Sequence, residues 1–164
     1  MTAAGAIVWF TGLPASGKTT LAERVRARLD RPAVVLDSDV MREVLEASSY
    51  AGSDRDHFYR VLAHLAAMLA RQGLVVLVAA TAPRRAHRAL AREATARFFE
   101  VWVHTPLGEC ARRDVKGLYA QAGAGAITTL PGAGAPYEPP VDPDVIADGG
   151  LDDEAASAIL RLVS

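Results

Sequence analysis

Residues 12–19 carry a spacing of glycine, lysine and threonine that suits the binding of a nucleoside triphosphate. They read G-x-x-x-x-G-K-T between an apolar run and a helical pattern, the order of strand, loop and helix that a phosphate-binding loop requires. Lys18 is predicted to bridge the β- and γ-phosphates, and the Thr19 hydroxyl to ligate Mg²⁺. The loop predicts the following ATP-binding residues: Gly12, Leu13, Pro14, Ala15, Ser16, Gly17, Lys18, Thr19 and Thr20.

Two aspartates follow the next apolar run, residues 33–36. Asp37 and Asp39 come where that predicted strand ends, and ligands bind at the carboxyl ends of strands in open α/β sheets. A carboxylate there can accept the proton of an attacking hydroxyl or hold a Mg²⁺-bound water. Asp39 could also be the N-cap of the helical stretch that follows. We predict Lys18 and Asp39 as catalytic residues, with Asp37 and Asp39 beside the acceptor.

Three basic residues outside the loop are candidates for holding anionic groups. Arg42 lies one turn after Asp39, and Arg55 opens a long helical stretch. Each planar guanidinium could hold an anionic substrate group, and each could equally be a solvated surface arginine. Lys116 precedes Gly117 at the start of an irregular segment, a pattern that suits a lid closing over phosphates.

These residues must be positioned by elements that alternate between strand and helix. Continuous apolar runs predict strands at residues 6–10, 33–36, 74–79, 98–104 and 145–147. Helical periodicity predicts helices at residues 19–29, 40–45, 54–72, 83–96, 105–113 and 152–162. Thr105 is the expected N-cap of the helix at 105–113. The alternation favours one three-layer α/β domain over residues 1–164, with a parallel sheet and helices on both faces.

Residues 115–143 interrupt the alternation. They are rich in glycine, alanine and proline and show no sustained period, so we predict a mobile lid there.

We interpret the remaining conspicuous side chains structurally. Core positions are expected for the two tryptophans, a solvated helix face for four arginines and surface or helix-face positions for four histidines: Trp9, Trp102, Arg84, Arg85, Arg88, Arg92, His57, His64, His87 and His104.

Composition limits the partners that the chain is expected to have. The formal net charge of −1 gives no global basic field, so neither nucleic acid nor a membrane surface is expected as a partner. Cys110 is the single cysteine, so no intrachain disulfide can form, which is compatible with a reducing cytoplasm. The longest apolar run, residues 74–82, is the size of a strand and too short to span a bilayer. The predicted location is the cytoplasm.

The order of these motifs resembles that of the adenylyl-sulfate kinases, which phosphorylate the ribose 3′-hydroxyl of adenylyl sulfate with ATP. The resemblance covers about residues 7–148 and implies a P-loop kinase fold. It rests on the phosphate loop and on seven further pieces: residues 36–39 with Arg42, residues 54–55, residues 72–79, residues 100–107, Cys110 with residues 113–114, residues 116–119 and residues 136–140 with Pro143. By this resemblance Arg113 lies beside the ATP adenine, and Asp39 lies next to the acceptor hydroxyl. The resemblance also implies an acceptor site formed by these residues: Asp37, Asp39, Arg42, Tyr50, Arg55, Phe58, Lys116, Gly117, Leu118 and Leu130.

The chain departs from the family pattern on the acceptor side. The family sandwiches the acceptor adenine between two phenylalanines, where this chain has Tyr50 and Leu130, and it has an asparagine where this chain has Phe58. A lost aromatic face forfeits base stacking of about 1–3 kcal/mol. Two acceptors therefore stay open: adenylyl sulfate, and another nucleotide or small hydroxylated metabolite.

The sequence predicts an ATP-dependent kinase with Mg²⁺ as cofactor, whose partners are ATP and a small-molecule acceptor. The chain could act as a homodimer. An alternative of another class is a regulatory module that binds a nucleotide without transferring phosphate, although Lys18, Thr19 and Asp39 argue against it. A switch GTPase is disfavoured because the chain lacks the Asn-Lys-x-Asp guanine signature.

Overall fold

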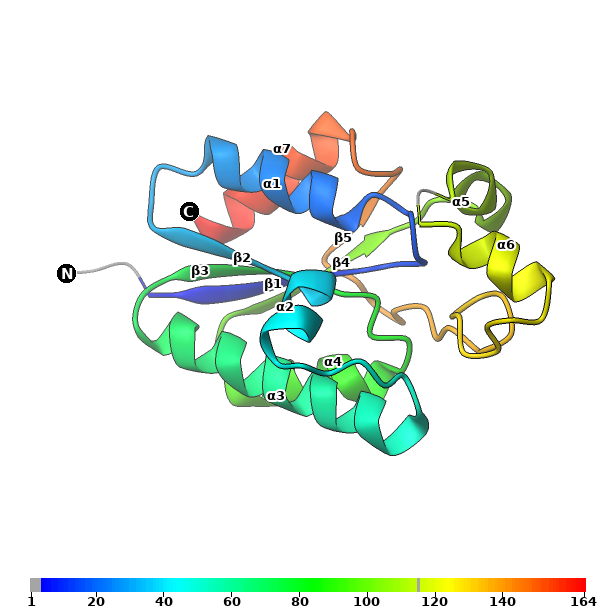
Figure 1. Ribbon diagram of the computed structural model, residues 1–164. Helices are drawn as coiled ribbons and strands as arrows, with labels where there is room; N and C mark the ends of the chain where they lie inside the picture. The colour runs from blue at the N-terminus through cyan, green and yellow to red at the C-terminus, as the bar shows by residue number, and fades with distance from the viewer. Residues whose placement is uncertain (1–3, 115) are drawn as a thin grey trace.

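Five parallel strands form one sheet in the order β2-β3-β1-β4-β5 in the computed structural model, which describes residues 4–114 and 116–164. The strands are β1 Ala6–Thr11, β2 Ala33–Asp37, β3 Val75–Ala79, β4 Phe98–Val103 and β5 Val145–Ala147. All five were expected from their apolar runs, and the predicted α/β class with helices on both faces is confirmed (Figure 1).

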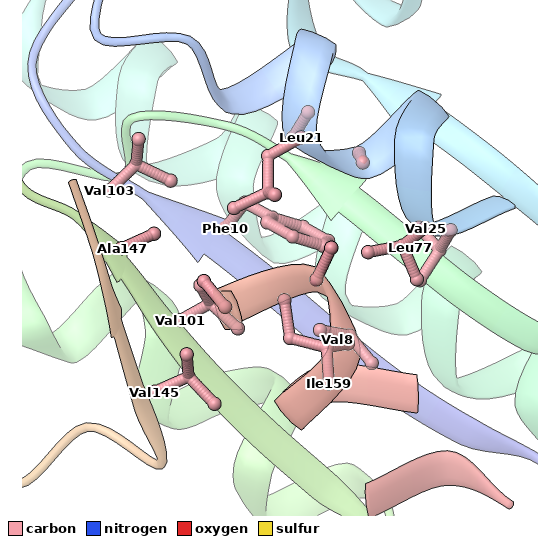
Figure 2. Close-up of a cluster of buried hydrophobic side chains, with 14 of the residues drawn as sticks. Val8, Phe10, Leu21, Val25, Leu77, Val101, Val103, Val145, Ala147 and Ile159 are labelled. Atoms are coloured by element: carbon pink, nitrogen blue, oxygen red, sulfur yellow. The ribbon is translucent and has the colours of Figure 1, made fainter. Parts of the chain in front are cut away.

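Alternate residues of β1 point to opposite faces of the sheet, and each face is covered by two helices. Ala6, Val8 and Phe10 pack with α1 Lys18–Arg28 and α7 Asp153–Val163 (Figure 2). Ile7 and Trp9 pack on the other side with α3 Gly52–Arg71 and α4 Arg85–Ala94. Every residue of β1 is buried, which is why the strand has no polar face.

The remaining helices lie near the carboxyl ends of the strands. They are α2 Ser38–Val44, α5 Leu107–Arg113 and α6 Leu118–Gly123, and Figure 1 shows α5 and α6 beyond the end of β4. The predicted cap of α5 is wrong: Pro106 is the N-cap, and Thr105 instead donates its hydroxyl to the Ser16 carbonyl at 2.7 Å. Helix α6 was not predicted, since an alanine and glycine composition gives no apolar period.

The predicted lid begins at Val115, which lies outside the described residues. Its described part contains α6 and, further along the chain, an isolated β-bridge between Pro131 and Ala135. The far end of the segment is tied to the sheet, because the Tyr137 hydroxyl is 2.9 Å from Thr11 Oγ1 and the Glu138 amide donates to the Pro83 carbonyl at 2.7 Å. Mobility of the lid stays a prediction.

Several structural interpretations of polar and aromatic side chains need correction. Arg88 is buried rather than solvated. His87 lies on a helix, α4, as one of the two alternatives allowed, and it is buried there. Trp9 is in the core as expected, whereas Trp102 is only partly buried and stacks on His104 at 4.2 Å between ring centroids. Sequence periodicity misses such cases because it cannot show which polar side chains find a buried partner. Within the described residues, no helix has both the length and the apolar character needed to cross a membrane.

Candidate active site

The loop between β1 and α1 curls back on its own lysine. Gly17 has φ 101°, and a Cβ built there would lie 2.6 Å from the Gly150 amide nitrogen, so no side chain fits. Lys18 Nζ donates to the carbonyls of Gly12 at 3.1 Å and Leu13 at 2.8 Å. These contacts place the ammonium beside the start of α1, where the first backbone N–H groups of a helix can bind an anion.

Burial changes the acidity of this lysine. The pKa of Lys18 is lowered to about 8 because the side chain is desolvated, and the negative charge of Asp39 opposes part of that effect. A phosphate bound in the loop would stabilise the charged form of Lys18, because it would replace the water that burial has removed.

The two predicted carboxylates have different local roles. Asp37 Oδ1 accepts hydrogen bonds from the amides of Asp39 at 2.8 Å and Val40 at 3.4 Å, so Asp37 is the N-cap of α2. Its other oxygen accepts a hydrogen bond from the Thr19 hydroxyl. Asp39 was considered as the cap, and this alternative is wrong: its carboxylate instead forms an ion pair with Lys116. The carboxylate of Asp39 is therefore paired with a cation of the predicted lid and does not cap α2.

One cavity of about 690 Å³ brings most of the predicted residues together. Its lining combines residues of the phosphate loop, both aspartates and residues of the acceptor side: Pro14, Ala15, Gly17, Lys18, Thr19, Thr20, Asp37, Asp39, Arg42, Tyr50, Arg55, Arg113, Lys116, Leu118 and Leu130. A phosphate-binding loop, a carboxylate and basic side chains around one space can hold a polyphosphate beside a second substrate.

Some predicted residues do not line this cavity. Phe58 is 1% exposed and lies in the core beneath Arg42, and the cavity wall does not include Gly117. Gly12, Leu13 and Ser16 also lie behind the wall, where the first two supply the carbonyls that hold Lys18. A direct contact between Phe58 and an acceptor is therefore not supported by its position.

Arg42 and Arg55 donate hydrogen bonds to two different segments of the chain beside the cavity. Arg42 donates through Nη1 to the carbonyls of Ala47 at 2.9 Å and Ser49 at 3.1 Å, and it is buried. Arg55 donates through Nη2 to the Thr129 carbonyl at 2.8 Å, which connects α3 to the segment predicted as a lid. Neither is a free surface arginine.

The site also contains residues that sequence analysis missed. Tyr119, on α6, lines the cavity and donates its hydroxyl to the Pro14 carbonyl of the phosphate loop at 2.7 Å. Arg113, by contrast, was expected at the ATP site from the family resemblance, and its Nη1 donates to the Ala15 carbonyl at 3.4 Å. Thr105 donates its hydroxyl to the Ser16 carbonyl of the loop, and the backbone of Gly150 lies close to Gly17. Only the Gly149-Gly150 pair after the last strand gave a signal in the sequence, since paired glycines often mark a close backbone approach.

Tyr59 forms part of the cavity wall and rests on a buried histidine. Its ring stacks on His87 with centroids 4.6 Å apart, and its hydroxyl accepts the Ala82 amide at 3.1 Å. His87 Nε2 lies 2.7 Å from Asp56 Oδ1. Burial lowers the pKa of His87, although the hydrogen bond with Asp56 opposes that effect. The stack and hydrogen bonds fix this wall between α3 and the end of β3.

Comparisons with known proteins agree with this arrangement. The family model described as adenylylsulphate kinase matches residues 4–148. An adenylyl-sulfate kinase of Synechococcus sp. (strain JA-3-3Ab) is 44% identical over 146 residues, which cover 87% of this chain and 83% of the relative. The bifunctional enzyme CysN/CysC of Mycobacterium tuberculosis is 44% identical over 98% of this chain, which spans only 28% of that relative.

A solved structure agrees over nearly the whole chain. The APS kinase CysC of Mycobacterium tuberculosis, solved in complex with AMPPNP and APS, has a TM-score of 0.90 and 43% sequence identity. The alignment covers 98% of each chain. The family match and these relatives lead to one conclusion: the chain belongs to the adenylylsulphate kinase family.

Proposed function

We propose that this protein is an ATP-dependent kinase that transfers the γ-phosphate of ATP to the ribose 3′-hydroxyl of adenylyl sulfate. One observation carries the proposal: Lys18 and Thr19 of the phosphate loop line the same cavity as Asp39 and Arg55. Donor and acceptor groups can therefore meet in one enclosed space. Membership of the adenylylsulphate kinase family supports the same acceptor.

We assign the donor side to the phosphate loop. Residues 12–20 would surround the ATP phosphates, and Arg113 would lie beside the adenine. The hydrogen bond from Arg113 to the Ala15 carbonyl supports this assignment, since it keeps the arginine next to the loop.

The proposed step is an in-line phosphoryl transfer. The acceptor oxygen bonds to the γ-phosphorus while the bond from that phosphorus to the β–γ bridging oxygen breaks, which releases ADP. Asp39 accepts the proton of the attacking hydroxyl. Lys18 stabilises the negative charge on the transferred group. Lys116 pairs with Asp39 Oδ2, so its ammonium lies beside the carboxylate that would take this proton.

Magnesium fits the oxygen ligands of the phosphate loop. The Thr19 hydroxyl and the Asp37 carboxylate are hydrogen-bonded to each other, and both are hard oxygen donors. No group of three or more histidine, cysteine, aspartate or glutamate residues that could hold a metal occurs among residues 4–114 and 116–164. That absence matches an ion held chiefly by substrate phosphates, with Thr19 as protein ligand and Asp37 next to it. Mg²⁺ would neutralise charge on the phosphates.

Of the two positions at which the family resemblance implies phenylalanines, one keeps an aromatic ring. Tyr50 is 47% exposed and lines the cavity, whereas Leu130 is largely buried and offers an apolar surface. This combination supports an acceptor with a planar base that stacks on one side only. The same departure from two aromatic faces favours the second candidate, a kinase of another nucleotide or small hydroxylated metabolite.

An assay that couples ADP release to a measured signal tests the proposal. We expect turnover at micromolar adenylyl sulfate, with the product heavier by one phosphate. ADP release with another acceptor, and none with adenylyl sulfate, would favour the second candidate. ATP binding without any phosphorylated product would favour a non-catalytic module. Asp39→Asn serves as the control, because it should bind ATP and lose turnover.

The homodimer stays a prediction, which sedimentation of the full chain would test.

A further inference from the structure

The side chain of Arg42 is enclosed between two aromatic rings. Its guanidinium carbon lies 3.9 Å from the centroid of the Tyr50 ring and 4.0 Å from that of the Phe58 ring. The two rings come from different places: Phe58 is in the core on α3, and Tyr50 is on the loop before that helix. The three side chains therefore form a stack that runs from the core to the cavity wall.

The stack holds the loop between α2 and α3. Residues 47–50 have no regular secondary structure, and Arg42 Nη1 donates to the carbonyls of Ala47 and Ser49 within this loop. Both hydrogen bonds of Arg42 in the described residues use Nη1, so their geometry depends on the plane of the guanidinium. The guanidinium carbon lies over both rings, so the rings limit how the guanidinium can turn.

Phe58 is the fixed end of the stack. It is 1% exposed, whereas Tyr50 is 47% exposed and forms part of the cavity wall. A cation–π contact is stronger when it is desolvated, so the contact of Arg42 with Phe58 outweighs its contact with Tyr50. Without the Phe58 ring the guanidinium could rotate. Its hydrogen bonds to the loop carbonyls and its contact with Tyr50 would then weaken together.

We infer that Phe58 is a positioning residue for the acceptor, which acts through Arg42 to fix Tyr50 as one wall of the acceptor site. The inference rests on the proposed function, since Tyr50 matters only if an acceptor binds beside it. It gives a phenylalanine that does not itself line the cavity a route by which to affect acceptor binding. It also assigns Arg42 a structural role in the loop in addition to any contact with the acceptor.

Steady-state kinetics of Phe58 variants test this inference. In Phe58→Leu we expect the KM for adenylyl sulfate to rise about tenfold, with the KM for ATP and kcat within about twofold of wild type. Fluorinated phenylalanines at position 58 should raise that KM step by step, because fluorine makes the ring face less negative at nearly constant size. In the double variant Phe58→Leu/Tyr50→Leu, the two effects should be less than additive.

A matched control separates positioning from packing. Leu62 is fully buried one turn along the same helix, so Leu62→Val should lower stability and leave the KM for adenylyl sulfate unchanged. A KM for adenylyl sulfate that does not respond to fluorination would overturn the inference, as would a parallel rise in the KM for ATP. If wild type does not turn over adenylyl sulfate, the proposed function fails and takes this inference with it. An active wild type with unresponsive variants rejects the inference alone.

Discussion

Arg88 and Glu100 form a buried ion pair between α4 and β4, with Arg88 Nε 2.8 Å from Glu100 Oε2. Arg88 also donates to the carbonyls of Ala82 and Glu138. One side chain thus connects the sheet, the end of the lid segment and the turn after β3. Because Glu100 is buried, its charge has no solvent to replace this partner.

Replacement of Arg88 should be among the most destabilising single changes in the chain. We expect Arg88→Met to lower the free energy of unfolding by about 3–5 kcal/mol, since it leaves a buried carboxylate without its main cation. Arg92 contacts the same glutamate at 3.4 Å from a half-exposed position, so Arg92→Ala should cost about 1 kcal/mol or less. Chemical denaturation measures both variants. Equal losses would contradict the special importance of the buried pair.

ATP binding should take up a proton at alkaline pH. Burial lowers the pKa of Lys18 to about 8, and bound phosphates favour its charged form, so its pKa rises on binding. The affinity for ATP should therefore fall as the pH rises above 8, approaching about tenfold per pH unit for one proton. Calorimetry at pH 8.5 in buffers of different ionisation enthalpy measures the uptake. A Lys18→Arg variant that still binds ATP should show no uptake, because arginine stays charged.

Asp39 and Asp37 should respond differently to amide substitution. We expect Asp39→Asn to lower kcat by about 10²- to 10⁴-fold with little change in ATP affinity, because it removes the proposed proton acceptor. Asp37→Asn should retain the cap of α2, because an asparagine oxygen can accept the same backbone hydrogen bonds. Asp37→Ala should lose about 1 kcal/mol of stability. Turnover of Asp39→Asn at the wild-type rate would reject the assignment.

Two glycines offer a matched test of the phosphate loop. Gly17→Ala should abolish ATP binding or unfold the protein, because the new Cβ would lie 2.6 Å from the Gly150 nitrogen at a left-handed φ of 101°. Gly108, within α5, has nothing within 4 Å of a built Cβ, so Gly108→Ala should stabilise the protein by up to about 1 kcal/mol. Thermal denaturation and nucleotide titration of both variants measure the difference. Wild-type ATP affinity in Gly17→Ala would refute the close approach.

Local pattern was sufficient for the strands and for the phosphate loop. The apolar runs predicted all five strands, and in β1 and β3 the run is continuous because every residue of these strands is buried. The motif at residues 12–19 predicted a loop between strand and helix because its glycines and lysine act through their immediate neighbours. Helix α6 was missed, and Thr105 was assigned to a cap that it does not form. In both cases contacts with the phosphate loop, far away in the chain, accompany the observed arrangement.

Partners of buried polar groups could not be read from the sequence. Arg88 and His87 lie on a helix whose spacing suggested a solvated face, and each is buried because a carboxylate from another element meets it. Phe58 was expected in the acceptor site and instead lies in the core, beneath the guanidinium of Arg42. Such pairings depend on how α3, α4 and β4 meet in space, and residue spacing within one element carries no information on that.

The sequence by itself determined the class of the fold, the phosphate loop and the family resemblance, because these depend on local spacing and on motif order. Only the tertiary structure decided that Asp37 caps α2, that Asp39 pairs with Lys116 and that Arg42 is enclosed by two rings. The physical reason is that hydrogen bonds and ring contacts are satisfied between elements distant in the chain. Their partners exist only once the sheet and its helices have packed.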